Sequence, residues 1–242
     1  MEIPQEVLSV MKKAKKIAVL TGAGISAESG LITFRGKDGI WEKFDPDEVA
    51  TPGAWKKDPL KVWEFHEEFR KAIAEHEPNP AHFTLAEIEK SSDDFTLITQ
   101  NIDQYHQDAG SKNVIELHGN VWRVKCLKEG TVSVNKDVPM KQLPPYCSCG
   151  SMLRPDVVWF NEPLPPAALE NAFKATYECD LMIVVGTSIV IYPAAMLPSF
   201  AYEHGAKIIE FNLEPTPISH LAMFSFFGKA GETLPEVWEK AR

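Results

Sequence analysis

The sequence has few cysteines and no apolar segment of the kind that directs secretion or spans a membrane. Only four cysteines occur among 242 residues, and residues 1–16 follow the pattern of an amphipathic helix without the apolar h-region of a signal peptide. The most apolar stretch, residues 181–200, is interrupted by Gly186, Pro193 and Pro198, so we expect a buried strand, a loop and a helix there. These absences predict a cytoplasmic protein with reduced thiols and no membrane partner.

Basic residues are scarce relative to acidic ones. The chain has 25 Lys and Arg against 34 Asp and Glu, which gives a formal net charge of −9. Sequence-independent binding to nucleic acid depends on basic side chains that neutralise phosphates, so we expect no direct nucleic-acid partner. The apolar fraction of 44% is ordinary for a globular protein, and the length suits one domain with a smaller attached lobe. We expect a monomer.

The first motif is an incomplete glycine fingerprint. Residues 17–20 are an apolar run that predicts a buried strand, and Gly22 and Gly24 follow it directly. Such a turn brings the backbone close to a phosphate, because no side chain fills the space and free N–H groups face the anion. Ala27 stands where the full pattern has its third glycine, so the glycines alone leave open a tight turn without a ligand.

Two polar motifs follow later in the chain. Asn101 and Asp103 come after an apolar run at residues 95–98, and His118 lies between a leucine and a glycine. Histidine titrates near neutral pH and suits general-base catalysis. Taken singly, Asn101 and Asp103 also fit turn or cap residues, and His118 also fits a hydrogen-bonded structural histidine.

Alternating strands and helices predict the fold class. Helical patterns at residues 80–90 and 165–177 lie between apolar runs that predict strands, and this alternation indicates an α/β fold with a doubly wound, mostly parallel, Rossmann-like sheet. The predicted strands are residues 17–20, 95–98, 157–160, 181–185 and 208–211.

Two segments interrupt this alternation and predict a small inserted lobe. Residues 36–80 have helical spacing, and residues 121–154 contain short strands and three of the four cysteines. The larger lobe then comprises residues 1–35, 81–120 and 155–242.

Taken together, the motifs resemble those of one family. They occur in the order and at the spacing found in the sirtuins, NAD-dependent protein lysine deacylases, which the sequence resembles over nearly its whole length. The resemblance implies a single catalytic domain, with a substrate cleft between a nucleotide-binding lobe and a small lobe. The matching segments are Gly22-Ala23-Gly24-Ile25-Ser26, Thr33-Phe34-Arg35-Gly36, Thr99-Gln100-Asn101-Ile102-Asp103, Leu117-His118-Gly119, Arg154-Pro155-Asp156-Val157-Val158-Trp159-Phe160, Gly186-Thr187-Ser188 and Asn212.

The resemblance implies an NAD site along the loops of the nucleotide-binding lobe. Arg35 would supply charge for the phosphates, and Phe34 would shield the reactive carbon from water. A side-chain amide, such as that of Asn101, can pair with the carboxamide of nicotinamide. The implied NAD-binding residues are Gly22, Ala23, Gly24, Ser26, Phe34, Arg35, Gln100, Asn101, Asp103, Gly186, Thr187, Ser188, Asn212, Glu214 and Ala230.

The implied reaction transfers an acyl group and moves no hydride. The acyl oxygen of a modified lysine attacks C1′ of the nicotinamide ribose, and nicotinamide leaves. His118 then acts as general base on a ribose hydroxyl, with Asn101 as the second catalytic residue, to give free lysine and O-acyl-ADP-ribose. The acyl-lysine peptide would enter as an added strand beside residues 157–161 and 189–192, unless residues 157–160 are only a core strand. The implied substrate-binding residues are His66, Phe69, Val157, Val158 and Phe160.

The cysteines depart from the family pattern. A zinc-ribbon-like module usually has two Cys-x-x-Cys pairs, but here Cys126 is followed by Glu129 in the second position, and the other pair is compressed to Cys147 and Cys149. Either zinc is held by the three cysteines and a fourth ligand of another type, or the lobe has lost its metal. Cys179 fits a buried core thiol.

The acyl pocket departs from one subgroup. Sirtuins that prefer succinyl or malonyl lysine carry a Tyr-x-x-Arg pair on the small-lobe helix, and His66 and Phe69 occupy those positions here. Arg70 is one residue further on, which turns it by about 100° around a helix. We therefore expect a preference for acetyl or other uncharged acyl groups. Asn161 also replaces a usual glycine.

Other functions fit parts of the same pattern. A protein mono-ADP-ribosyltransferase or a desuccinylase-type deacylase could use the same NAD site. A dehydrogenase would usually show the fuller glycine fingerprint. A binding protein that senses NAD or ADP-ribose would not need the base His118.

Overall fold

The larger lobe is built around a six-stranded parallel sheet. The computed structural model describes residues 2–34 and 39–242. The strand order is β3-β2-β1-β7-β8-β9, and all neighbouring strands run parallel. The strands are β1 (Lys16–Thr21), β2 (Asp94–Thr99), β3 (Val114–Glu116), β7 (Leu181–Val185), β8 (Lys207–Asn212) and β9 (Phe224–Phe227). Four predicted strands, at residues 17–20, 95–98, 181–185 and 208–211, are confirmed.

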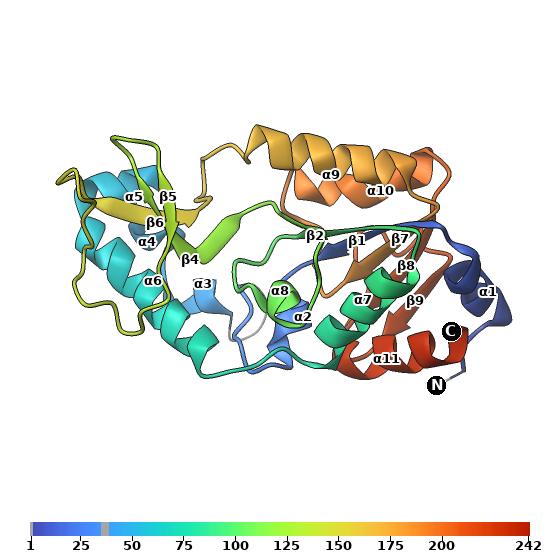
Figure 1. The fold of residues 1–242 in the computed structure, drawn as a ribbon. Helices are drawn as coiled ribbons and strands as arrows, with labels where there is room; N and C mark the ends of the chain where they lie inside the picture. Colours follow the sequence, from blue (N-terminus) through green and yellow to red (C-terminus); the bar gives the residue numbers. More distant parts are fainter. Residues whose placement is uncertain (1, 35–38) are drawn as a thin grey trace.

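Helices cover both faces of this sheet, as Figure 1 shows. One layer comprises α1 (Gln5–Lys13), α7 (Pro80–Ser91) and α11 (Ala230–Ala241), and the other comprises α9 (Pro166–Glu178) and α10 (Leu197–Glu203). In β1, Ile17 and Val19 pack with the first layer, whereas Ala18 and Leu20 pack with the second. Because both faces are buried, the strands read as continuous apolar runs, and the helices predicted between them are confirmed.

The smaller lobe combines four helices with an antiparallel sheet. Its helices are α3 (Ile40–Lys43), α4 (Pro46–Val49), α5 (Pro52–Lys57) and α6 (Pro59–Ala74), and its sheet has the order β5-β4-β6, with β4 (Gly119–Cys126), β5 (Val132–Val134) and β6 (Leu153–Val157). Helices α4, α5 and α6 each begin with a proline after a residue whose side chain caps the helix: Asp45, Thr51 or Asp58. Figure 1 shows this lobe at the end of the molecule remote from both termini.

The strand predicted at residues 157–160 is wrong. β6 ends at Val157 and pairs antiparallel with β4 in the smaller lobe, instead of joining the parallel sheet. Beyond it, the N–H of Val158 donates to the carbonyl of His118 at 2.9 Å, so this apolar segment lies beside the loop that follows β3. Burial between the two lobes, and not within a sheet, explains its apolar character.

Short helical turns complete the chain. They are α2 (Gly24–Ala27), α8 (Tyr105–Asp108) and the 3₁₀ turn η1 (Ala194–Met196). Residues 181–200 form β7, a loop, η1 and the start of α10, as predicted. Within the part of the chain that the structure describes, no helix is both long enough and apolar enough to cross a membrane.

Candidate functional site

The predicted functional motifs meet along one edge of the parallel sheet. In the sheet, β2 and β3 lie on one side of β1, and β7, β8 and β9 lie on its other side, so the order of the strands reverses between β1 and β7. Ligands of open parallel sheets bind at such a switch point, beyond the carboxyl ends of the strands. The segments that follow β1, β2, β3 and β7 and that end β8 are residues 22–26, 100–103, 117–119, 186–188 and Asn212.

The glycines after β1 allow close contact with the loop after β7. The N–H of Gly22 donates to Val185 O at 3.2 Å, and that of Gly24 donates to Gly186 O at 2.8 Å. A Cβ atom on Gly24 would lie 2.7 Å from the same Gly186 oxygen. The free N–H groups that we expected at this turn are therefore not those of the two glycines, whose main role is to let the two loops touch.

Three buried polar residues form a connected group at the switch point. The Ser26 hydroxyl donates to Asp103 Oδ2 at 2.7 Å, and Asn101 Nδ2 donates to Ser26 Oγ at 3.2 Å and to Gly22 O at 3.1 Å. All three side chains are at least nine-tenths buried. Burial raises the pKa of Asp103, although hydrogen bonds from Ser26 and from the N–H of Tyr105 oppose this shift. The sequence predicted these three residues, and the structure brings them together.

A pocket opens beside this group and is lined by both lobes. Phe34 and Phe69 form an apolar wall with ring centroids 5.4 Å apart, and Phe69 belongs to α6 of the smaller lobe. The pocket is lined by Ala23, Ser26, Leu31, Ile32, Phe34, Phe69, Asn101, Ile102 and Asp103.

His118 is held as a neutral base. Its Nδ1 lies 2.9 Å from Gln100 O, and because a carbonyl only accepts, we assign the ring hydrogen to Nδ1 and the lone pair to Nε2. Burial lowers the pKa of His118, and the bond to Gln100 partly opposes this effect. The ring is therefore neutral at neutral pH, as a general base must be.

Thr187 accepts hydrogen bonds from the loop after β2 and from the end of β8. Gln100 Nε2 donates to Thr187 Oγ1, and Asn212 Nδ2 donates to Thr187 O, both at 2.9 Å. Two predicted binding residues, Ser188 and Glu214, are exposed, so their side chains are accessible to a ligand.

The remaining two predicted binding residues are Ala230 and Arg35. Ala230 is buried as the first residue of α11. Arg35 lies outside the described residues.

His82 is a site residue that sequence reasoning missed. Its Nδ1 accepts from the N–H of Asn79 at 3.2 Å, so its Nε2 carries the hydrogen and faces Ser26 Oγ at 3.4 Å. Burial lowers the pKa of His82 to about 3, which keeps the ring neutral. The signal in the sequence was the helix start at Asn79-Pro80, which places His82 in the first turn of α7, below the switch point.

His106 is the second missed residue. Its Nε2 lies 2.9 Å from Thr21 Oγ1, which in turn donates to Thr99 Oγ1 at 2.8 Å. Because the Thr21 hydrogen goes to Thr99, His106 must donate from Nε2. Thr99 Oγ1 also accepts the N–H of Asn101 at 3.0 Å, so this chain of hydrogen bonds helps to position Asn101. Buried threonines at the ends of two apolar strands were the available signal.

Two predicted substrate residues, Phe69 and Phe160, lie in an aromatic cluster, whereas Val158 packs against the core of the larger lobe. Trp41 stacks on Phe65 at 5.8 Å between ring centroids and meets Phe34 and Phe160 at 5.5 Å. Phe34 and Phe69 line the pocket, and Trp41, Phe65 and Phe160 extend the cluster beyond it.

His66 lies against this cluster and is neutral. Its Nδ1 donates to Val62 O at 2.7 Å, which leaves Nε2 to accept from Trp159 Nε1 at 3.3 Å. Burial, reinforced by the charges of Arg154 and Arg70, lowers the pKa of His66 from 6.5 to about 4.

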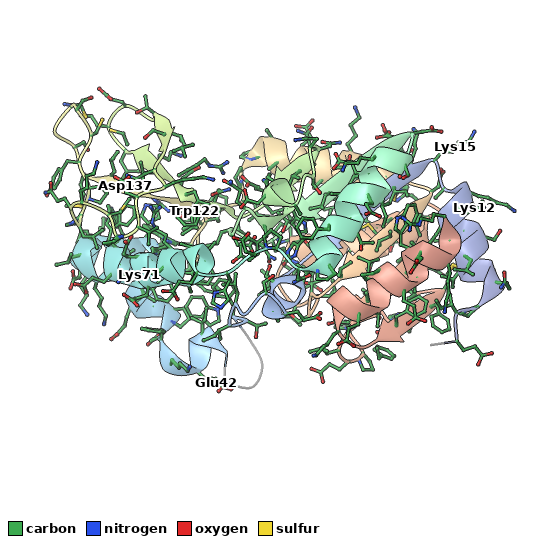
Figure 2. The ribbon with its side chains drawn as sticks, turned by 60° about the horizontal axis from the view of Figure 1, so that its bottom comes forward. Lys12, Lys15, Glu42, Lys71, Trp122 and Asp137 are labelled. Atoms are coloured by element: carbon green, nitrogen blue, oxygen red, sulfur yellow. The ribbon has the colours of Figure 1, made fainter. Side chains whose placement is uncertain are left out.

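Arg70 is buried and bonded within the smaller lobe. Its side chain is fully buried, it donates to three backbone carbonyls that include Asp137 O at 2.8 Å, and its Nε lies 3.2 Å from a Glu67 carboxylate oxygen. The guanidinium also lies over the Trp122 ring at 4.9 Å. Figure 2 labels Trp122 and Asp137 beside α6. Arg70 is therefore not among the residues that line the pocket.

Residues 157–161 offer fewer free backbone donors than we expected. The N–H groups of Val158, Trp159 and Phe160 all donate within the chain. A peptide strand can pair here only with the remaining groups. On the opposite side, Val190 and Tyr192 are exposed by 47% and 74%.

The structure gathers three cysteines and one glutamate in the smaller lobe. Cys126 Sγ lies 3.7 Å from Cys149 Sγ, and Cys147 Sγ lies 3.4 Å from Glu129 Oε2. The four donor atoms all lie within 4.8 Å of one another, and this donor set fits zinc. Cys179 is separate and buried, and burial raises the pKa of its thiol to about 11.

Comparisons with known proteins agree with this arrangement. The sequence model of the Sir2 family matches residues 22–193. A protein of Pyrococcus furiosus named NAD-dependent protein deacylase is 49% identical over 243 residues, which cover 98% of this chain and 97% of that protein. The structure of a Sir2 homologue–NAD complex has a TM-score of 0.93 at 42% identity and covers 100% of this chain and 94% of that one. A Sir2 complex with a p53 peptide and NAD+ has a TM-score of 0.86 at 35% identity and covers 99% and 98%. This chain belongs to the Sir2 family.

Proposed function

We propose that this protein is an NAD-dependent protein lysine deacylase that transfers the acyl group of a modified lysine to ADP-ribose. The observation that carries the proposal is the neutral His118 ring, whose Nε2 has a lone pair at the carboxyl edge of the sheet. Relatives over nearly the whole chain carry the name NAD-dependent protein deacylase, and solved relatives hold NAD and a peptide.

The buried polar group at the switch point supports an NAD site. When bound, NAD supplies the ADP-ribosyl group that accepts the acyl group as nicotinamide leaves. We assign the nicotinamide end to the pocket beside Asn101 and Asp103, whose side chains Ser26 orients. We assign the other end to Thr187 and Asn212.

His118 has one task in this reaction. Its Nε2 takes a proton from a ribose hydroxyl, while the bond from Nδ1 to Gln100 O fixes the ring and stabilises the positive charge that it gains. Removing the ring removes the proton acceptor and its hydrogen bond to Gln100 O, but none of the hydrogen bonds that pair β1, β2 and β3.

Mass spectrometry of an acetyl-lysine peptide, with and without NAD, tests the function. We expect NAD-dependent loss of the acetyl group with formation of O-acetyl-ADP-ribose, and a fall in rate of about 10²–10⁴-fold in His118→Ala. His220→Ala is the control, because His220 is an exposed histidine on the β8–β9 connection. Near-normal turnover by His118→Ala contradicts the assignment of His118 as the base. Protein that gains ADP-ribose, without loss of the acetyl group from the peptide, indicates ADP-ribosyl transfer instead.

The apolar wall formed by Phe34 and Phe69 supports a preference for uncharged acyl groups. Phe34 and Phe69 offer no hydrogen-bond donor to an acyl carboxylate, and Arg70 is bonded elsewhere. A succinyl or malonyl group would lose water without gaining a charged partner. Acetyl-lysine and succinyl-lysine peptides of one sequence should therefore be compared directly, and faster removal of succinyl contradicts this prediction.

We further propose that the protein acts as a cytoplasmic monomer on acyl-lysine proteins. The four free cysteines fit a reducing compartment, and the net charge of −9 fits protein partners better than nucleic acid.

A further inference from the structure

The cysteine group of the smaller lobe has a carboxylate as its fourth member. We propose that Glu129 is a direct metal ligand, so that this chain holds a structural zinc ion with three thiolates and one carboxylate. The bound ion would cross-link residues 126–129 to residues 147–149. The inference concerns the framework of the lobe and does not depend on the proposed reaction.

Two of the distances between donor atoms match edges of a zinc tetrahedron. Zn–S bonds of about 2.3 Å and Zn–O bonds of about 2.1 Å give edges of about 3.8 Å between two sulfurs and about 3.6 Å between sulfur and oxygen. The structure has 3.7 Å between Cys126 Sγ and Cys149 Sγ, and 3.4 Å between Cys147 Sγ and Glu129 Oε2. These two contacts are opposite edges of one tetrahedron.

The backbone places Glu129 in the position of a ligand. Both ligand-bearing turns end in a left-handed glycine: Gly130 has φ 70° and donates to Cys126 O, and Gly150 has φ 79° and donates to Cys147 O. Glu129 therefore precedes its glycine just as a cysteine precedes the glycine of the other turn. Its N–H also points at Cys126 Sγ, at 3.5 Å.

No basic residue explains the position of Glu129. Among residues 2–34 and 39–242, no Lys, Arg or His forms an ion pair with it. A carboxylate gathered with three thiols gains most from a cation between them. Cys126 is fully buried and Glu129 is exposed, so the carboxylate closes the side of the site that faces solvent.

A site with one carboxylate should release its metal more easily than a site of four thiolates. Oxygen is a harder ligand than thiolate and binds zinc less covalently, and here it is also the ligand that water can reach. We therefore expect that Glu129→Cys binds zinc more tightly than the natural chain, and that Glu129→Gln binds it about ten-fold or more weakly.

The test uses metal binding by the full chain, not its activity. Zinc affinity is measured in reducing buffer by competition with a chromogenic chelator, and the ligand set is read from the absorption spectrum after Co²⁺ replaces zinc. Glu129→Cys should move the cobalt bands to lower energy, as a fourth thiolate does. Glu64→Gln is the matched control, because Glu64 is an exposed glutamate on α6 outside the cluster.

Two results would overturn the proposal. One is a Glu129→Gln protein with the zinc affinity and cobalt spectrum of the natural chain, which would place the fourth ligand elsewhere. The other is a natural chain that binds neither metal, which would leave Cys147 as a simple hydrogen-bond donor to Glu129. Because Glu129→Cys replaces the carboxylate with a thiolate at the same position, its tighter binding also separates loss of a ligand from misfolding in Glu129→Gln.

Discussion

Acid should destabilise this protein in part through His66, which is buried without charge beneath the aromatic wall of the pocket. Its pKa is about 4 in the folded chain and 6.5 without burial. A histidine whose pKa is lowered by folding stabilises the fold above its unfolded pKa, and this stabilisation is lost as the pH falls from about 6.5 toward about 4. Between pH 7 and pH 5, His66 alone should remove about 2 kcal/mol from the free energy of unfolding.

The structure explains why protonation is costly here. A second hydrogen on the ring would sit at Nε2, where Trp159 Nε1 now donates, so two donors would face each other. The charges of Arg154 and Arg70 would repel the cation, and only Val62 O accepts from the ring.

The assay is urea unfolding at pH 7 and at pH 5, for the natural chain and for His66→Phe. Phenylalanine fills a similar volume but cannot titrate, so the variant should lose about 2 kcal/mol less on acidification, whatever its stability at pH 7. Contributions from other titrating groups are shared by both proteins and cancel. His220→Phe, at an exposed site, should behave as the natural chain does. Equal losses in the natural chain and in His66→Phe, within about 0.5 kcal/mol, would refute the reasoning.

Two further predictions concern the contact between the loops after β1 and β7 and, separately, the buried Arg70 of the smaller lobe. Gly24→Ala should raise the NAD dissociation constant and lower stability by about 1–3 kcal/mol, because its Cβ would lie 2.7 Å from Gly186 O; unchanged binding in an NAD titration would contradict this. Arg70→Gln should lower the free energy of unfolding by about 3–5 kcal/mol without gaining or losing activity on succinyl-lysine relative to acetyl-lysine, because Arg70 is a buried partner of Glu67 and not a pocket residue. A changed acyl preference in that variant would place Arg70 in the pocket.

The parallel sheet could be predicted from the sequence because burial on both faces leaves a simple signal. β7 is buried at every residue, and its apolar run stands out from its surroundings. Two strands of the smaller-lobe sheet carry no such signal, since β5 is exposed throughout and β6 contains Arg154 and Pro155. Hydrophobicity therefore predicts a strand at residues 157–160, whereas the strand is the less apolar segment before it, β6.

The site residues divide in a similar way. Asn101, Asp103 and His118 could be predicted because they belong to motifs that follow strands. His82 and His106 have only indirect signals in the sequence, because each acts through a contact between distant segments: His106 reaches Thr21 across 85 positions of the chain. The pairing of Glu129 with Cys147 likewise depends on how two turns approach in space.

Burial links the chemistry of the site to its sensitivity to acid. The same desolvation that keeps His118 neutral and ready to accept a proton also lowers the pKa values of His66, His82 and His106. Each of these buried imidazoles favours the unfolded chain once the pH falls below its unfolded pKa. Activity and stability should therefore decline over neighbouring pH ranges, and His66→Phe should shift the decline in stability without moving the pH dependence of catalysis that His118 sets.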